Sequence, residues 1–372
     1  MARLNSAVAF AVLVLATACS QYKPFDSVAH LRGEVAPRLG AARAASLDVP
    51  FALSPELTAA AQTVMRPAGA EREKVTHVID FIFDDLHLQY SVAPTRTAAS
   101  TYATRRGNCL SFVNLFVALA REQGLAPFYV EVTDYQKWSN RDGMVVSQGH
   151  IVGGMYLDGE LKTYDFLPYR PKAYRKFNPI DDLAAVAHYY NNLGAEALLA
   201  GDNATARGLL ETAVAIAPSF DRAYNNLGVA QARAGEVEPA LATYRKGLEK
   251  APDNTMIMTN MARLFQRQGR GKEADELLAK VDASNTTNPF FFVYEGEIAL
   301  SHGDTEKALD YMTKALRQDS EVPEVHLGFV KVYLALGELD KARHFLDRAL
   351  KLDATQAEAL RYAKLLLKKQ AG

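Results

Sequence analysis

The spacing of apolar residues divides the chain into parts with different expected structures. The apolar run Ala7–Ala16 is too short for a bilayer span, which needs about 20 such residues. After this run, apolar residues recur at helical spacing up to Gln123, and the last helix predicted from this spacing covers Cys109–Gln123. They alternate as in strands within Pro127–Phe166, and the helical spacing returns beyond that segment. The pattern predicts a mixed α and β region followed by an all-helical one.

Before Cys109 the pattern predicts three helices. Residues 19–53 are interpreted as a tether followed by a helix around Val28 to Ala45. Ser54 followed by Pro55 is typical of an N-cap with proline in the first turn, so a helix should run from there to about Met65. A further helix is predicted over Glu71–Leu86, where apolar residues fall on one face.

The strand-like part contains three predicted strands. They cover Pro127–Val132, Gly149–Leu157 and Leu161–Phe166, and a polar loop with Trp138 separates the first two. Asp158 and Gly159 form a dipeptide that favours a hairpin turn between the last two.

The C-terminal half has a period of 34 residues. Glycines recur at this interval (Gly201, Gly235, Gly269, Gly303 and Gly337), and alanines keep the same step (Ala206, Ala240, Ala274, Ala308 and Ala342). This period is the signature of tetratricopeptide repeats, in which each repeat is a pair of antiparallel helices. Five repeats are predicted over residues 187–354, followed by a capping helix over residues 355–372. The third repeat departs from the pattern, because the segment Ser284–Asn288 replaces a clean proline stop.

Asparagines also recur in phase with the repeats, at Asn192, Asn226 and Asn260. The resemblance to tetratricopeptide repeats implies that this position faces a concave groove, which would bind an extended protein or peptide. A side-chain amide both donates and accepts, so it could bond a ligand backbone. Alternatively, asparagine is simply the common residue at this position.

Chemistry is indicated by one cysteine, one histidine and one aspartate of the middle segment. Cys109 begins the predicted helix, and at a helix N-terminus the free amides and the dipole stabilise a thiolate. His150 lies at the start of the second predicted strand, and Asp165 lies near the end of the third. A nucleophile, a base and an orienting carboxylate form a catalytic triad. Each could instead be structural: a core thiol, a buried core histidine and a turn acid.

This arrangement resembles the transglutaminase-like superfamily over about residues 54–178. The matching motifs are Gly107-Asn108-Cys109, Gly149-His150 and Tyr164-Asp165. The resemblance implies an α+β, papain-like or transglutaminase-like domain in which a cysteine helix packs on an antiparallel sheet. The family often has an aromatic residue shortly after the histidine, whereas here Ile151-Val152-Gly153 follows.

The resemblance implies a thiol hydrolase or acyltransferase. Cys109 would attack an amide or ester carbonyl, His150 would move the proton, and Asp165 would orient the imidazole. The Cys109 amide would form part of the oxyanion hole, and Asn108 and Gln148 are candidates for the second donor.

The sequence Leu15-Ala16-Thr17-Ala18-Cys19 resembles a bacterial lipobox. Residues 1–18 would then be a signal peptide, and Cys19 would carry the lipid. Ser20 after the cysteine favours the periplasmic side of the outer membrane, if the source is Gram-negative. The alternative is an ordinary signal peptide with a chance cysteine.

Composition and motifs exclude some classes of ligand from the expected ones. The formal net charge is −1, so nucleic acid is not an expected partner. Neither metal-binding nor phosphate-loop motifs occur, so no metal or other cofactor is predicted. Two functions remain open: a membrane-anchored thiol enzyme with a partner-binding repeat array, or a non-catalytic envelope scaffold. A weaker possibility is an accessory function in assembly or secretion.

Overall fold

The computed structural model describes residues 25, 27–64, 69–141, 144–166, 174–284 and 286–371, with side chains excepted at 63–64, 134–141, 144–148, 283 and 368–371. The predicted signal peptide and Cys19 lie outside these residues. The described chain forms two compact units. The first comprises residues 1–136 and 149–243, and the second comprises residues 137–148 and 244–372.

The first helical segment among the described residues of the first unit is broken in two. Sequence spacing predicts one helix over Val28–Ala45, but the structure divides it into α2 (Val28–Leu39) and α3 (Ala41–Ala45). Gly40 lies between them with φ +81°, a conformation that ends an α-helix and suits glycine.

Short helices and a two-residue strand pair lead to the cysteine helix α7. They are α4 (Pro55–Val64), α5 (Glu71–Asp80), η1 (Phe81–Asp85), β1 (Gln89–Tyr90), α6 (Ala98–Thr104), β2 (Arg106–Gly107) and α7 (Cys109–Glu122). The predicted helix over Glu71–Leu86 is thus α-helical only to Asp80, and its last part is a π-helical turn. β1 pairs with β2 in parallel, so the residues before Cys109 enter α7 from a strand.

A four-stranded sheet follows α7. Its strands are β3 (Phe128–Arg141), β4 (Met144–Leu157), β5 (Glu160–Tyr164) and β6 (Phe177–Ile180), in the order β5-β4-β3-β6. β4 pairs with β5 and β3 pairs with β6, both antiparallel. The prediction of a polar loop around Trp138 is wrong, because β3 runs through this residue to Arg141.

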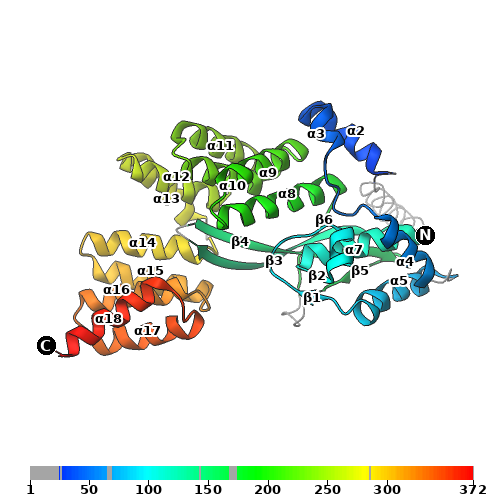
Figure 1. Cartoon of the computed structure of the whole chain (residues 1–372). Coiled ribbons are helices and arrows are strands. Elements are labelled where there is room, and N and C mark those ends of the chain that lie inside the picture. Colours follow the sequence, from blue (N-terminus) through cyan, green and yellow to red (C-terminus); the bar gives the residue numbers. More distant parts are fainter. Residues whose placement is uncertain are drawn as a thin grey trace, which may run out of the picture. The chain divides into compact units, whose positions relative to one another are not determined.

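The helix α7 is the centre of the core in the first unit. Every residue from Leu110 to Ala120 is buried, and Phe116 is completely so. A Cβ built on Gly153 of β4 would lie 2.6 Å from the Phe116 ring, so only glycine allows this close approach of helix and sheet. Figure 1 shows α7 lying against the sheet.

The first unit also contains the first repeat helices. These are α8 (Asp182–Leu199), α9 (Asn203–Ile216) and α10 (Asp221–Arg233), followed by α11 (Val237–Lys250), which continues into the second unit. The buried face of α8, with Ala185, Val186 and Tyr189, belongs to the same apolar core as α7. The first repeat therefore shares its core with the sheet-containing part.

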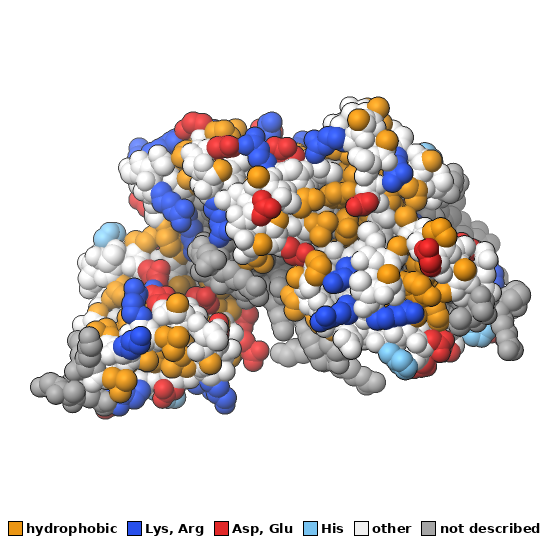
Figure 2. Space-filling view, viewed as in Figure 1, with side chains coloured by type: hydrophobic (Ala, Val, Ile, Leu, Met, Phe, Trp, Pro, Cys, Tyr) orange, Lys and Arg blue, Asp and Glu red, His pale blue; other side chains and the backbone are white. Residues whose placement is uncertain are grey.

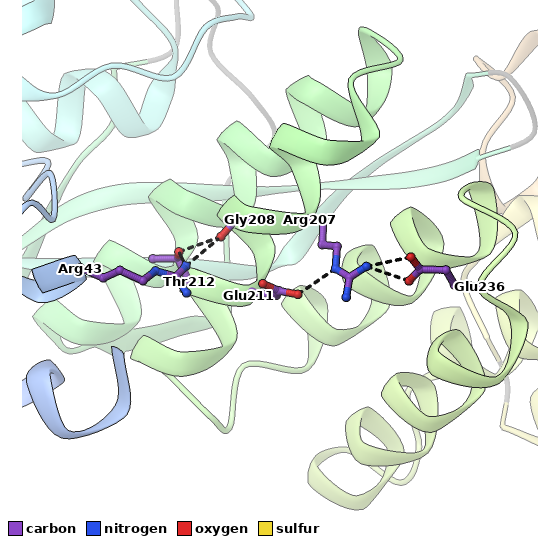
Figure 3. A network of polar contacts seen from close by, with 6 residues as sticks. All are labelled: Arg43, Arg207, Gly208, Glu211, Thr212 and Glu236. Carbon is purple, nitrogen blue, oxygen red and sulfur yellow. Dashed lines mark hydrogen bonds and ion pairs between the residues drawn. The ribbon is translucent and has the colours of Figure 1, made fainter. Parts of the chain in front are cut away.

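The N-terminal helices dock on the first repeat. Leu31 and Val35 of α2 are completely buried in the core that also holds Ile216 of α9. Arg43 of α3 donates to the Thr212 hydroxyl at 2.7 Å (Figure 3). In the same view, Arg207 bridges Glu211 and Glu236 with bonds of 2.8 to 2.9 Å.

The second unit consists mainly of helix pairs. Its helices are α12 (Thr255–Arg267), α13 (Gly271–Ala283), α14 (Pro289–Ser301), α15 (Thr305–Gln318), α16 (Pro323–Ala335), α17 (Leu339–Leu352) and α18 (Ala357–Ala371). At the end of the third repeat, Asn288 caps the next helix, α14, and Pro289 occupies the first turn of α14. Lys331 of α16 bridges Glu297 and Glu358, which links helices of successive repeats.

The glycines and alanines that recur every 34 residues lie in turns and in buried helix positions, respectively. The five glycines spaced by 34 residues have φ between +74° and +80° and form the turns within the repeats. The five alanines in phase with them are completely buried in the second helix of each pair. These local signals explain why sequence periodicity predicted the solenoid.

Charge is mixed on the visible face of both units. Acidic and basic side chains are interspersed in Figure 2 without a large area of one sign. Among the described residues, none of the helices is both long and apolar enough to cross a membrane. The described part of the chain also contains no group of three or more His, Cys, Asp or Glu side chains placed to hold a metal ion.

Candidate active site

The nucleophile candidate lies at the N-terminus of α7. Asn108 is the N-cap residue, and its Oδ1 accepts from the Ser111 amide at 3.0 Å. Gly107 is required directly before it, because a Cβ there would lie 2.5 Å from the Ser111 Cβ. Cys109 follows as the first helical residue and is a partly exposed free thiol.

The Asn108 cap satisfies one of the backbone amides in the first turn of α7. The first N–H groups of an α-helix have no intrahelical partner, and Asn108 satisfies the one at Ser111. The amides of Cys109 and Leu110 belong to the same first turn, at the positive end of the helix, where negative charge is favoured.

Asn108 itself does not serve as a free donor. Its side-chain NH2 group donates to the Thr95 hydroxyl at 2.7 Å and to the Val92 carbonyl at 3.3 Å. This candidate for the second oxyanion donor is thus engaged in holding the loop that precedes α6. The side chain of Gln148, the other candidate, lies outside the described side chains.

His150 and Asp165 form a direct pair. The His150 Nε2 and the Asp165 Oδ1 are 2.9 Å apart. The His150 side chain is 2% exposed, whereas that of Asp165 is 26% exposed. β4 supplies the histidine, and the aspartate directly follows its neighbour β5, so strand pairing brings the two together.

Cys109, the third residue of the predicted triad, interacts with the imidazole of His150. Burial disfavours the charged ring, but the hydrogen bond with Asp165 and the side-chain interaction with Cys109 outweigh it, raising the pKa of His150 from 6.5 to about 9. The structure therefore brings Cys109, His150 and Asp165 together. With this pKa the ring is an imidazolium at neutral pH and donates from Nε2 to Asp165.

Tyr174 also belongs to this site, although the sequence pattern did not indicate it. Its hydroxyl donates to the Asp165 Oδ2 at 2.9 Å, and its ring centroid lies 5.4 Å from that of His150. It fixes the second carboxylate oxygen, so both oxygens of Asp165 are engaged. Residue spacing could not reveal this contact, because Tyr174 lies outside the alternating pattern that identified the strands.

The other predicted site residues belong to other parts of the chain. Asn192, Asn226 and Asn260 are on α8, α10 and α12, the first helices of their pairs, and each is half-buried. Asn226 donates to the side chain of Asn191 at 2.9 Å, which links two successive repeats. Cys19 is outside the described residues.

Sequence profiles identify two modules. The Transglutaminase-like superfamily profile matches residues 58–169, and the Tetratricopeptide repeat profile matches residues 197–257 and 299–367. The chain therefore contains a transglutaminase-like domain and tetratricopeptide repeats. The cysteine, histidine and aspartate of the site all lie within the first match.

Curated relatives resemble only parts of the chain. Cellulose synthase operon protein C of Xanthomonas axonopodis pv. citri is 39% identical over 84 residues, covering 23% of this chain and 6% of its own. Tetratricopeptide repeat protein 21A of Mus musculus is 30% identical over 179 residues, which cover 47% of this chain and 12% of that protein. The chain thus spans only a small fraction of the length of these relatives.

Solved structures are similar to about half of the chain. The thermophilic protein TTC0263 of Thermus thermophilus is 24% identical, covers 49% of this chain and 99% of its own, and gives a TM-score of 0.43. PilF of Pseudomonas aeruginosa is 25% identical and gives a TM-score of 0.41. The match covers 50% of this chain and 86% of the PilF chain.

The raised pKa of His150 generates a testable prediction. Because the pKa is about 9 in the folded protein and about 6.5 in an unfolded chain, the contacts of the imidazolium stabilise the fold fully below pH 6.5. This contribution is lost as the pH rises through 9. Asp165→Asn should lower the pKa of His150, and it should destabilise the protein more at pH 6 than at pH 10.

The measurement is NMR titration of the histidine rings, with thermal unfolding at the two pH values. His188 is an internal control, since burial and the nearby Arg222 lower its pKa to about 3, and its ring should stay neutral throughout. A wild-type His150 that titrates at or below pH 6.5 would contradict the geometry.

Proposed function

We propose that this protein is a membrane-anchored thiol enzyme of the transglutaminase-like type, a hydrolase or acyltransferase that acts through a cysteine thioester. The observation that carries the proposal is the position of His150, which bonds Asp165 and interacts with the side chain of Cys109. A buried histidine held between a carboxylate and a thiol at a helix N-terminus is the arrangement that activates a cysteine nucleophile.

The first half-reaction forms the thioester. The Cys109 sulfur attacks the carbonyl carbon of an amide or ester, and the oxygen becomes an oxyanion facing the amides of Cys109 and Leu110. The C–N or C–O bond then breaks, and the imidazolium of His150 gives its proton to the leaving amine or alcohol. Asp165 and Tyr174 keep the ring oriented while it loses and regains its proton.

The second half-reaction releases the acyl group. The now neutral imidazole of His150 takes a proton from water or from an amine, which attacks the thioester carbonyl. The C–S bond breaks, and the Cys109 thiolate and the imidazolium are restored. Water gives hydrolysis, and an amine gives acyl transfer.

The repeats supply the second part of the proposal. Tetratricopeptide repeats generally mediate protein–protein interactions, so the array is proposed to bind a protein or peptide partner or substrate. Asn192, Asn226 and Asn260 are proposed to contribute to its groove. Their position on the first helix of each pair supports this assignment.

The anchor is proposed at Cys19. The short apolar run and the small residues before this cysteine support cleavage and lipidation, which would hold the protein at the cell envelope. In a Gram-negative source, the outer membrane facing the periplasm is the proposed location.

The covalent step can be tested with p-nitrophenyl acetate as an acyl donor. Mass spectrometry should find one acetyl group on Cys109 during turnover, and Cys109→Ala should abolish both the adduct and the release of p-nitrophenol. His150→Ala should slow the acylation by about 10²-fold or more, because the proton carrier is lost.

His77→Ala is the matched control, since this histidine is exposed on α5 and distant in sequence from the triad. A wild-type protein that forms no acyl adduct on Cys109 would leave the non-catalytic scaffold as the better account.

The anchor has its own test. Cys19→Ser should leave the protein without lipid, and fractionation of the producing bacterium should move it from the membrane to the aqueous fraction. Metabolic labelling with an alkyne fatty acid reports the modification directly. A labelled band that persists in the Cys19→Ser variant would refute lipidation at this residue.

A further inference from the structure

We propose that Glu196, which belongs to the first repeat, is a positioning residue for Cys109, so that the repeat array is part of the catalytic apparatus as well as a binding module. The inference rests on the proposed function of Cys109 as a nucleophile. It assigns a task to a carboxylate that lies on α8, outside the match to the transglutaminase-like profile.

A continuous chain of hydrogen bonds joins Glu196 to the cap of α7. The Glu196 Oε1 accepts from the backbone amide of Thr95 at 2.8 Å and from its hydroxyl at 2.7 Å. The same hydroxyl accepts from the Asn108 side-chain amide at 2.7 Å. Asn108 in turn accepts from the Ser111 amide and hydroxyl, at 3.0 and 2.9 Å.

A second bond closes the chain into a ring. The Ser111 hydroxyl accepts from the Arg96 amide at 2.8 Å, and Arg96 directly follows Thr95. The segment of Thr95 and Arg96 is therefore held on one side by the repeat helix α8 and on the other by the first turn of α7.

Burial makes each link in the chain costly to lose. Thr95 is 3% exposed, and Asn108 and Ser111 are also buried, so bulk water can replace few of their hydrogen bonds. Removing one partner leaves a buried donor unsatisfied, which costs more than the bond contributes on average. The loss of Glu196 should therefore shift the loop and the cap, because the remaining groups must find new partners.

The cap determines the direction of the nucleophile. Asn108 immediately precedes Cys109, and its bond to Ser111 fixes the first turn whose amides form the oxyanion hole. Displacements of about 1 Å at such a position can lower a rate by about 10²-fold. Loosening the cap thus affects reactivity without removing any reacting group.

The second repeat contacts the strand of the base in a similar way. Arg222 on α10 pairs with Glu131 of β3. A Cβ built on Gly149 would lie 2.7 Å from the Arg222 Nη1, so the guanidinium touches the backbone directly before His150. Repeat helices therefore contact both the element that carries the nucleophile and the element that carries the base.

The test compares Glu196→Ala, Glu196→Gln and Glu211→Ala in the full chain. Glutamine keeps an oxygen that can accept both bonds from Thr95, so this variant should behave like the wild type. Glu211→Ala removes an exposed carboxylate of α9 that pairs with Arg207, and it should also have no effect. Glu196→Ala should slow the alkylation of Cys109 by iodoacetamide by about tenfold to 10²-fold.

Hydrogen–deuterium exchange of the same variants supplies a readout independent of thiol chemistry. Glu196→Ala should accelerate exchange at the Thr95 amide and, through the cap, at the Ser111 amide. Thr95→Val is a second variant that keeps the side-chain shape and the backbone bond but removes the hydroxyl. It should raise exchange at Ser111 and slow alkylation even if Glu196→Ala does not fold.

The outcomes separate the two proposals. Faster exchange at Ser111 with slower alkylation supports the positioning function. Unchanged exchange at Ser111, or wild-type alkylation in both Glu196→Ala and Thr95→Val, would overturn it. A wild-type Cys109 that is inert, with exchange at Ser111 still dependent on Glu196, would refute the nucleophile and uphold the structural link.

Discussion

The rest of the site depends on a helix N-terminus that is buried inside the first unit. Amides at a buried helix end need partners, and Asn108 supplies one of them through its side chain. The cap residue is itself buried and needs partners of its own, which Thr95 and the carbonyl of Val92 provide. Cys109 is placed next to this network, where the remaining amides and the helix dipole favour negative charge.

His150, the proposed base, is buried in a way that by itself disfavours charge. His150 is almost completely buried, which alone would keep its ring neutral. The Asp165 carboxylate and the nearby thiol reverse this preference, and Tyr174 holds the carboxylate from its other oxygen. The nucleophile candidate and the base are thus each oriented by a separate part of the fold.

Local signals explain which features the sequence predicted. The helix that begins at Cys109 and the turn glycines of the repeats depend on residues next to them in the chain, and both are present. The strand through Trp138 and the contact of Tyr174 with Asp165 were not predicted, since they depend on pairing and packing between distant segments. The split at Gly40 was not predicted either, although its cause, a glycine with positive φ, is local. The bond from Glu196 to Thr95 spans 101 residues and links two modules whose sequence patterns are independent.

The central claim is that Cys109 and His150 form a working pair, and the pH dependence of iodoacetamide alkylation tests it most directly. A soluble form of residues 20–372 is compared with its His150→Ala variant between acid and alkaline pH. The account predicts rapid labelling of Cys109 already at acid pH, and its loss in the variant. Slow labelling that rises only at alkaline pH and is unchanged by His150→Ala would contradict it and indicate a structural thiol.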